Sequence, residues 1–267
     1  MRQRFSLVPL LFVLALLVPL YWLVTMSLKS NAEIAGQLTL VPHAPTLEHY
    51  RFILSDADWF WGYMNALIYV GLNVVIAVGV AVPAAYALAR RDFFGHRALF
   101  FGFLTFRMMA PPILLVPFVQ IFSELRLIDT HIAVALAHCF FNVPIAIWIL
   151  EGFISAVPRE MDETALVDGY SFPRFFGRIL LPQIAPGIAV AAFFCFMFSW
   201  IEFLLANALT TINAKPIAGI MTRAGGVMVG DYALLAAASV LGLVPGVVLV
   251  FLMKNHIARG FSMGRIT

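Results

Sequence analysis

Charged residues are scarce in this sequence. Only 12% of its 267 residues are Asp, Glu, Lys or Arg, whereas 62% are hydrophobic, and the mean hydropathy is +0.94. Soluble domains contain about 25% charged residues, so this chain cannot cover the surface of a water-soluble fold of its size. The formal net charge of +3 is too small to indicate a nucleic-acid partner. The composition therefore predicts a protein whose main solvent is the lipid bilayer.

The sequence also has only two cysteines and no phosphate-binding loop motif. The two cysteines, Cys139 and Cys195, lie inside apolar runs and lack the neighbours that a metal site needs, so we expect small buried core residues. No Gly-x-x-x-x-Gly-Lys-Ser/Thr loop occurs, and Gly225-Gly226 does not replace one. We therefore predict no catalytic residue, metal or cofactor in this chain.

Long apolar runs dominate the sequence instead. A helix needs about 20 residues to cross about 30 Å of hydrocarbon. Six segments reach this length: residues 7–28, 62–89, 98–122, 130–150, 187–209 and 232–253. Backbone amides find no partner in lipid, so these runs must be helices, and they lack the alternation of a membrane β-barrel. No internal repeat divides the chain, which predicts one all-α domain over residues 1–267 with about six transmembrane helices.

The basic residues predict how these helices are oriented. If the N-terminus is cytoplasmic, the inside segments hold eleven Lys and Arg residues and the outside segments hold five. Because Lys and Arg accumulate on the cytoplasmic side, both termini are expected there. The outer segment 29–61 is then expected to form a short layer, with Trp59 and Trp61 at the membrane interface. The longest cytoplasmic segment is 155–186.

Residues 155–186 have the pattern of two short helices joined by a glycine. A proline followed by acidic residues favours the start of the first helix. Gly169 supplies a position without Cβ, as a sharp turn requires, and Asp168 beside it either caps the next helix or is solvated. The second helix is expected to end at Pro182 and Pro186. From these features alone, the loop is either a projection that docks on a partner or an interfacial hairpin without one.

The same loop resembles the EAA motif of binding-protein-dependent ABC importer permeases. That motif reads Glu-Ala-Ala, three residues, Gly, nine residues and Ile-x-Leu-Pro. The matching residues are Glu163, Ala165, Gly169, Ile179, Leu181 and Pro182, and Thr164 replaces the first alanine. The resemblance implies a type I ABC importer permease fold. It also implies that Glu163, Ala165, Asp168, Gly169 and Pro182 form the element that couples to an ATPase, with Glu163 pairing with a basic residue there.

Other segments resemble the carbohydrate branch of this family, the second permease of maltose-type importers. They are Tyr86-Ala-Leu-Ala-Arg90, Met108-Met-Ala-Pro-Pro112, Phe198-Ser-Trp-Ile-Glu-Phe203 and Arg259-Gly-Phe-Ser-Met-Gly264, with Ile201 where the family has asparagine. The resemblance implies a sugar or polyol substrate, with glycerol as one candidate. It also implies a bacterial inner-membrane complex with a second permease, two ATPase subunits that bind ATP and Mg²⁺, and an extracytoplasmic solute-binding protein.

Polar residues within the runs are candidates for the translocation pathway. A charge near mid-membrane costs about 2.5–3.5 kcal/mol on insertion scales, so Arg107 should face protein or water. Arg107 either pairs with Glu202, binds a substrate hydroxyl or anchors a bend at Pro111 and Pro112. His138 and Asn142 are four residues apart on one helical face, and they either line the channel or hold helices together.

Aromatic residues and rival functions complete the prediction. Trp200 is a candidate for stacking on a sugar ring.

A secondary transporter would need coupling carboxylates in its spans, and Glu202 is alone there. A membrane enzyme would need clustered His and acidic residues, whereas His131 and His138 lack a matching carboxylate set. An ABC permease for a solute other than a carbohydrate is the remaining alternative.

Overall fold

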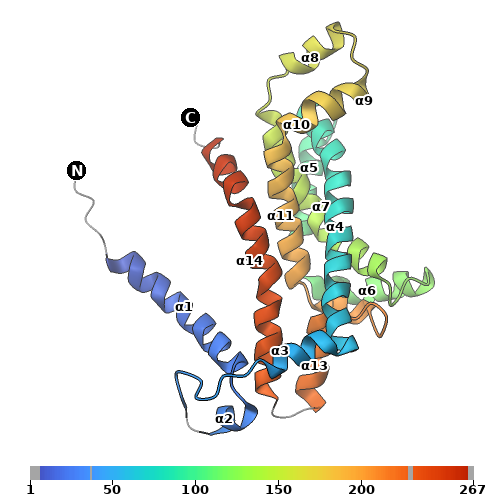
Figure 1. Ribbon diagram of the computed structural model, residues 1–267. Coiled ribbons are helices and arrows are strands. Elements are labelled where there is room, and N and C mark those ends of the chain that lie inside the picture. The colour runs from blue at the N-terminus through green and yellow to red at the C-terminus, as the bar shows by residue number, and fades with distance from the viewer. Residues whose placement is uncertain (1–6, 37, 228–230, 264–267) are drawn as a thin grey trace. The chain divides into compact units, whose positions relative to one another are not determined.

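The computed structural model describes residues 7–36, 38–227 and 231–263, and every regular element in these ranges is a helix (Figure 1). The elements are α1 (Leu7–Ser27), α2 (Asn31–Ala35), α3 (Glu48–Ser55), α4 (Ala57–Arg90), α5 (His96–Arg107), α6 (Pro111–Glu124), α7 (His131–Ser155), α8 (Glu160–Val167), α9 (Phe172–Phe175), the π-helical turn η1 (Phe176–Leu180), α10 (Leu181–Gln183), α11 (Ala185–Ile201), α12 (Leu204–Leu209), α13 (Ile217–Val227) and α14 (Tyr232–Met263). The all-α prediction is confirmed for these residues. The expected tail motif at 259–264 lies outside the residues whose side chains are described.

Three helices in the described ranges are long and apolar enough to cross a membrane: Ala57–Arg90, His131–Ser155 and Tyr232–Lys254. Two bent helix pairs raise the number to five if each pair is one span. In α1 the apolar stretch Leu11–Ser27 is shorter than these. By length and composition, the described part of the chain therefore has three to five candidate spans, where the sequence predicted six.

The expected third span, 98–122, is not one straight helix. Its residues form α5 and α6, which meet at 94°. Pro111 and Pro112 open α6, and Ala110 before them is extended, with φ −73° and ψ 132°. A proline donates no backbone hydrogen bond and disfavours helical backbone in the preceding residue, so the diproline breaks the helix at this point.

The expected fifth span, 187–209, is also interrupted. α11 ends at Ile201, Glu202 is extended with φ −75° and ψ 111°, and α12 begins at Leu204. At its other end, α11 meets the helical stretch Phe172–Gln183 at 76°. Apolar composition alone did not reveal these breaks, because the residues on both sides of Glu202 are apolar.

Met64–Pro216, together with the chain from Val248, form one compact unit. Within it α7 packs against α5 and α11, and α6 packs against α12. The fully buried positions are rich in alanine, including Ala77, Ala81 and Ala85 of α4 and Ala146 of α7. Small side chains let membrane helices approach closely, which explains how this unit packs without large core residues at these positions.

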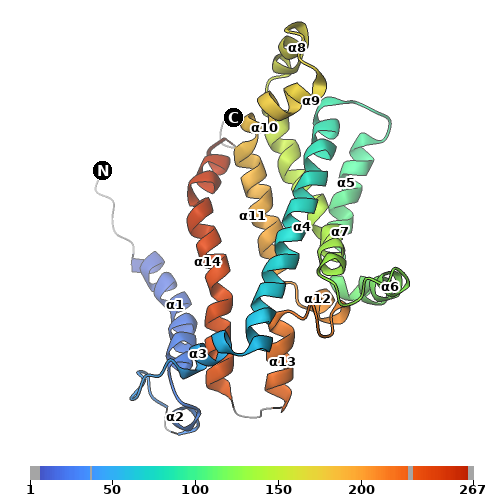
Figure 2. The same ribbon diagram turned by 45° about the vertical axis from the view of Figure 1, so that its right-hand side comes forward.

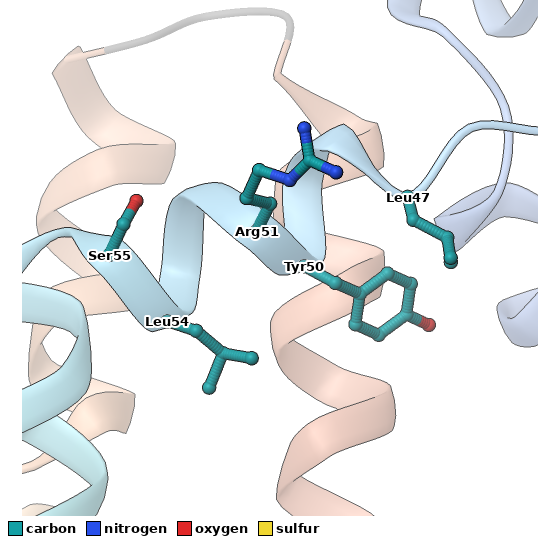
Figure 3. A pocket seen from close by; sticks show the side chains of 5 residues that line it. All are labelled: Leu47, Tyr50, Arg51, Leu54 and Ser55. Carbon is teal, nitrogen blue, oxygen red and sulfur yellow. The ribbon is translucent and has the colours of Figure 1, made fainter.

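Met1–Tyr63 and Ile217–Val247 form the second unit. Its core cluster contains Ile53, Trp59, Ile217, Leu234, Ala237 and Ala238. The Trp59 side chain is only 6% exposed in this core, whereas Trp61 is 56% exposed. The position of both tryptophans at the membrane interface stays a prediction. Along α3, the residues Leu47, Tyr50, Arg51, Leu54 and Ser55 line a hollow of about 430 Å³ (Figure 3). This lining comes from one short helix.

Asp129 fastens the loop after α6 to the loop after α12. Its carboxylate accepts hydrogen bonds from the backbone N–H groups of Thr211, Ile212, Asn213 and Ala214 at 2.8–3.2 Å, and from the Asn213 side chain. Asp129 itself has φ 63°, in the left-handed region that aspartate tolerates better than most residues. One carboxylate thus orders four consecutive backbone donors.

These contacts change the protonation of Asp129. Partial burial raises the pKa of the carboxyl, but the backbone hydrogen bonds from Asn213, Thr211 and Ala214 outweigh it and hold the pKa well below its ordinary value. A carboxyl whose folded pKa is depressed stabilises the fold above its unfolded pKa, about 4. That stabilisation is lost as the pH falls below about 4 toward the folded pKa.

Replacement of Asp129 by asparagine is expected to loosen this pair of loops. Asparagine also tolerates left-handed backbone, so the substitution removes the charge and one acceptor while sparing the conformation. Hydrogen bonds to charged groups contribute about 1.5–3 kcal/mol, and we expect the free energy of unfolding to fall by about that amount. Thermal unfolding in detergent measures the loss, with the exposed Asp92→Asn as the matched control. Equal melting temperatures for Asp129→Asn and wild type would contradict the prediction.

Candidate functional site

A projection formed by residues 156–183 extends beyond the ends of α4 and α7, and it carries α8 and α9 (Figure 1, Figure 2). Its helical end, Phe172–Gln183, passes through Pro182 and bends into α11 at Ile184. The helix thus ends at Gln183, between Pro182 and Pro186, which is the stretch where the sequence predicted its end. Pro186 lies in the first turn of α11, where a missing N–H costs nothing.

Gly169 closes α8 with a Schellman motif. The N–H of Tyr170 donates to the carbonyl of Ala165 at 3.0 Å, and the N–H of Gly169 donates to that of Leu166 at 3.1 Å. This pattern needs a left-handed residue after the C-cap, and Gly169 has φ +77°. A Cβ built there meets nothing within 4 Å. The glycine is therefore required by its backbone conformation and not by crowding within this chain.

The predicted coupling residues divide into a buried group and an exposed group. Ala165 is 3% exposed and belongs to the core cluster that also holds the ends of α4 and α7. Glu163 and Asp168 are exposed, and beside them Leu166 and Val167 are 68% and 88% exposed. Asp168 is the C-cap of α8, and among the described residues its side chain makes no hydrogen bond to the following helix, which leaves the solvated alternative.

A second candidate site is a pocket of about 170 Å³ between the broken ends of the helices. Its lining residues are Arg107, Pro111, His138, Phe141, Asn142, Phe198, Ile201 and Glu202. These residues come from the end of α5, the start of α6, the middle of α7 and the end of α11. The two helix breaks thus bring four of the five predicted pathway residues to one cavity.

Glu202, the C-cap of α11, connects that helix to α12 and α7 at this pocket. Its carboxylate accepts hydrogen bonds from the backbone N–H groups of Leu204, Leu205 and Ala206 at 3.0–3.4 Å, so it caps the first turn of α12. His138 Nε2 lies 3.0 Å from Glu202 Oε2. The carboxylate therefore joins α7 to α12. It is also a charged acceptor for the N–H groups in the first turn of α12, which have no partner within the helix.

The hydrogen bonds of His138 fix its tautomer when the ring is neutral. A carboxylate only accepts, so Nε2 carries the proton and donates to Glu202. Nδ1 then accepts from the Ser199 hydroxyl, whose oxygen lies 2.6 Å away. The ring is 2% exposed and packs edge-on against Tyr69, with ring centroids 5.7 Å apart. His138 is thus held on all sides and presents a fixed polar group to the pocket.

Arg107 does not pair with Glu202 within the described residues, so that alternative is not supported. The Arg107 guanidinium lies over the Phe198 ring, 4.1 Å from its centroid. A cation over an aromatic face is attracted by the ring quadrupole. Arg107 therefore links the end of α5 to α11 across the pocket, next to the bend that begins at Pro111.

Asn142 both lines the pocket and holds helices together. Its Nδ2 donates to Asn73 Oδ1 at 2.7 Å and to the carbonyl of Cys195 at 3.2 Å, which joins α7 to α4 and α11. Asn73 in turn donates to the carbonyl of Ala135 at 3.0 Å. Sequence reasoning missed Asn73 as a partner, although an asparagine within an apolar run was a usable signal.

Trp200 lies elsewhere in the same unit. Its ring stacks on Phe196 with centroids 5.9 Å apart, and it packs against the apolar cluster formed by α4, α6, α7 and α12. It is not among the residues that line the pocket of about 170 Å³. In the described part of the chain, no group of three or more His, Cys, Asp or Glu side chains is placed to hold a metal ion.

Residues 77–263 match the family model described as "Binding-protein-dependent transport system inner membrane component". The chain is 30% identical to a sulfoquinovosyl glycerol transport system permease protein of Agrobacterium fabrum, over 93% of this chain and 88% of the relative. It is also 30% identical to a trehalose transport system permease protein of Mycobacterium tuberculosis, over 94% of this chain and 92% of the relative.

The fold also matches a solved structure. A bacterial ABC transporter involved in the import of the acidic polysaccharide alginate superposes with a TM-score of 0.77 and 20% identity, over 93% of both chains. At this identity the match supports the fold alone. A permease fold with two helix breaks beside a polar pocket is thus present in a chain whose relatives carry sugars.

Glu202→Gln is expected to destabilise the pocket end of the structure. A glutamine side chain replaces one carboxylate oxygen with an NH2 donor, so it cannot accept all of the hydrogen bonds that Leu204, Leu205, Ala206 and His138 donate. Leaving one buried donor without a partner costs about 1–3 kcal/mol. Thermal unfolding of the purified protein in detergent measures the change, and Glu124→Gln, at an exposed position, is the control. A melting temperature that falls no more in Glu202→Gln than in the control would rule out the capping role.

Proposed function

Because this chain belongs to the family of binding-protein-dependent transport system inner membrane components, we propose that it is the permease subunit of an ATP-driven importer for a sugar or polyol. The resemblance seen in the sequence is confirmed at the level of the family. The relatives are transport permeases, and the chain is a transport subunit, not an enzyme. The observation that carries the proposal is the family match over residues 77–263, which includes the projection and the pocket.

The substrate class is proposed from the relatives and from the pocket. The names of the relatives specify sulfoquinovosyl glycerol and trehalose. A further relative, in Thermococcus litoralis, is a trehalose/maltose transport system permease protein, 30% identical over 96% of this chain. The pocket offers a cation at Arg107, a carboxylate at Glu202 and an imidazole at His138 beside two phenylalanine rings. Such a mixture suits hydroxyl groups and the apolar faces of sugar rings. Glycerol itself remains one candidate within this class.

The pathway is proposed to pass the pocket, with Arg107, His138, Asn142 and Glu202 in contact with the solute's hydroxyl groups. Trp200 would contribute an aromatic face from the neighbouring cluster. A secondary transporter is a weaker proposal, because Glu202 already accepts four hydrogen bonds as a helix cap and partner of His138. A carboxylate that holds two helices is poorly suited to repeated proton or ion exchange.

The projection is proposed to face the cytoplasm and to couple to ATPase subunits. Its exposed surface combines Glu163 with the apolar Leu166 and Val167, which suits a partner groove with a basic rim. We propose that the complex contains a second permease, two ATPase subunits and an extracytoplasmic solute-binding protein in a bacterial inner membrane. Closure of the ATPase subunits would move the projection and reorient the helices that it joins.

Uptake assays test the transport function. In cells that lack only this gene, uptake of at least one labelled solute from a panel of trehalose, maltose and glycerol is expected to fall to background and to return with the wild-type gene. The tagged chain is expected to co-purify from membranes with an ATPase that contains a Walker A motif. Unchanged uptake of the whole panel with no ATPase in the purified material would overturn the proposal.

Two substitutions of Gly169 separate its backbone role from its small size. Left-handed backbone costs a β-branched residue about 1–2 kcal/mol, whereas asparagine tolerates it. We expect Gly169→Val to reduce ATP hydrolysis stimulated by the loaded binding protein about fivefold or more, and Gly169→Asn to retain most of it. Gly177→Ala, where a Cβ also meets nothing within 4 Å, is the control. If Gly169→Asn fails as completely as Gly169→Val, the requirement is for thinness at a partner surface and not for the turn.

A further inference from the structure

An ion pair joins the last residue of α4 to the first turn of α8. Arg90 Nε donates to Asp162 Oδ2 at 3.0 Å, and Arg90 Nη2 donates to Asp162 Oδ1 at 3.3 Å, so the contact is bidentate. The two side chains are only 7% and 16% exposed. A bidentate contact fixes orientation as well as distance, and a largely buried pair is screened less by salt than a surface pair.

Tyr86, one turn before Arg90, joins the same carboxylate. Its hydroxyl donates to Asp162 Oδ2 at 3.0 Å. The Tyr86 ring also packs against Phe172 and Phe176 of the second half of the projection, with ring centroids 5.6 and 5.7 Å apart. The end of α4 therefore contacts both helical halves of the projection.

Two side chain to backbone hydrogen bonds complete the connection. Arg90 Nη2 donates to the carbonyl of Val157 at 2.9 Å, and Arg159 Nη2 donates to the carbonyl of Ala89 at 3.3 Å. The segment that leads into α8 is thus held to α4 from both directions. Arg90 satisfies the carbonyl of Val157, just after the end of α7, and Arg159 satisfies a carbonyl in the last turn of α4, which has no helical partner.

The acidic residues of α8 differ in the direction that they face. Asp162 is turned toward α4, whereas its neighbours Glu160 and Glu163 are exposed. On α4, Arg90 is buried in the pair and the adjacent Arg91 is exposed. Each member of the pair therefore has a neighbour of like charge that does not take part, which supplies matched controls.

We propose that Asp162 and Arg90 are positioning residues that transmit movement of the projection to α4. The proposal rests on the coupling function proposed above, but it assigns the inner contact and not the contact with the ATPase. With the pair intact, a displacement of α8 moves the end of α4, because the bidentate contact and the Tyr86 hydrogen bond hold α8 at a fixed distance from α4. With the pair removed, the projection can still dock and move, while α4 follows incompletely.

The expected result is uncoupling of ATP hydrolysis from transport. In the complete complex reconstituted in liposomes, we expect Asp162→Asn and Arg90→Met each to lower the number of solute molecules imported per ATP hydrolysed about fivefold or more. The ATPase should still co-purify with both variants. A purely structural role would lower import and hydrolysis together and would leave this ratio unchanged.

A double-mutant cycle tests whether the two residues act through one another. The ratio for Arg90→Met with Asp162→Asn is expected to equal that of the worse single variant, because the contact can be lost only once. The controls are Arg91→Met and Glu160→Gln, for which the ratio of the wild type is expected. Independent, multiplying losses in the double variant would overturn the proposal.

The remaining outcomes separate this proposal from the proposed function. Loss of the ATPase from both single variants would overturn the transmission role, because the pair would then be needed for assembly. Wild-type ratios in both variants would overturn it and leave the importer function standing. If the wild-type complex itself neither imports solute nor hydrolyses ATP on addition of a loaded binding protein, the proposed function fails.

Discussion

In hydrocarbon, a backbone group that leaves a helix must find its partner inside the protein, and Glu202 is how this chain meets that constraint at its central break. The carboxylate accepts from three consecutive backbone donors of α12 and from His138 of α7. Without such an acceptor, the break after Ile201 would leave the first N–H groups of α12 unpaired. The pocket lies at this break, and the Glu202 carboxylate that accepts the hydrogen bonds of α12 is also part of the pocket's polar lining.

Carboxylates also connect chain segments at two other junctions in the unit that contains residues 64–216. Asp129 gathers the backbone donors of residues 211–214, and Asp162 gathers Arg90 and Tyr86 at the projection. In each case one carboxylate connects segments that are distant in sequence. Three of the chain's 14 acidic residues, Glu202, Asp129 and Asp162, thus connect helices and loops by accepting hydrogen bonds. This use explains why low charge content is compatible with a fold that has many interruptions.

The sequence predicted the helices and the projection well, because both depend on local signals. Apolar runs need helices in lipid, and Gly169 with the acidic start of α8 indicated two helices joined at a left-handed residue. The breaks at Ala110 and Glu202 were harder to predict. A diproline indicates a bend but not its angle, and nothing local distinguishes a carboxylate that caps a helix from one that faces a channel. The burial of Trp59 was not predicted for a similar reason, because it depends on residues near position 234.

α4 is the element through which the projection and the pocket share a physical connection. It is continuous from Ala57 to Arg90, and its last residue binds the projection. Nearly five turns earlier in the helix, Asn73 binds Asn142, which lines the pocket, and a cluster of buried alanines lies between Asn73 and Arg90. The part of α4 from Asn73 to Arg90 has a polar contact at each of these two residues, and a displacement of the projection can therefore reach the pocket along this one helix.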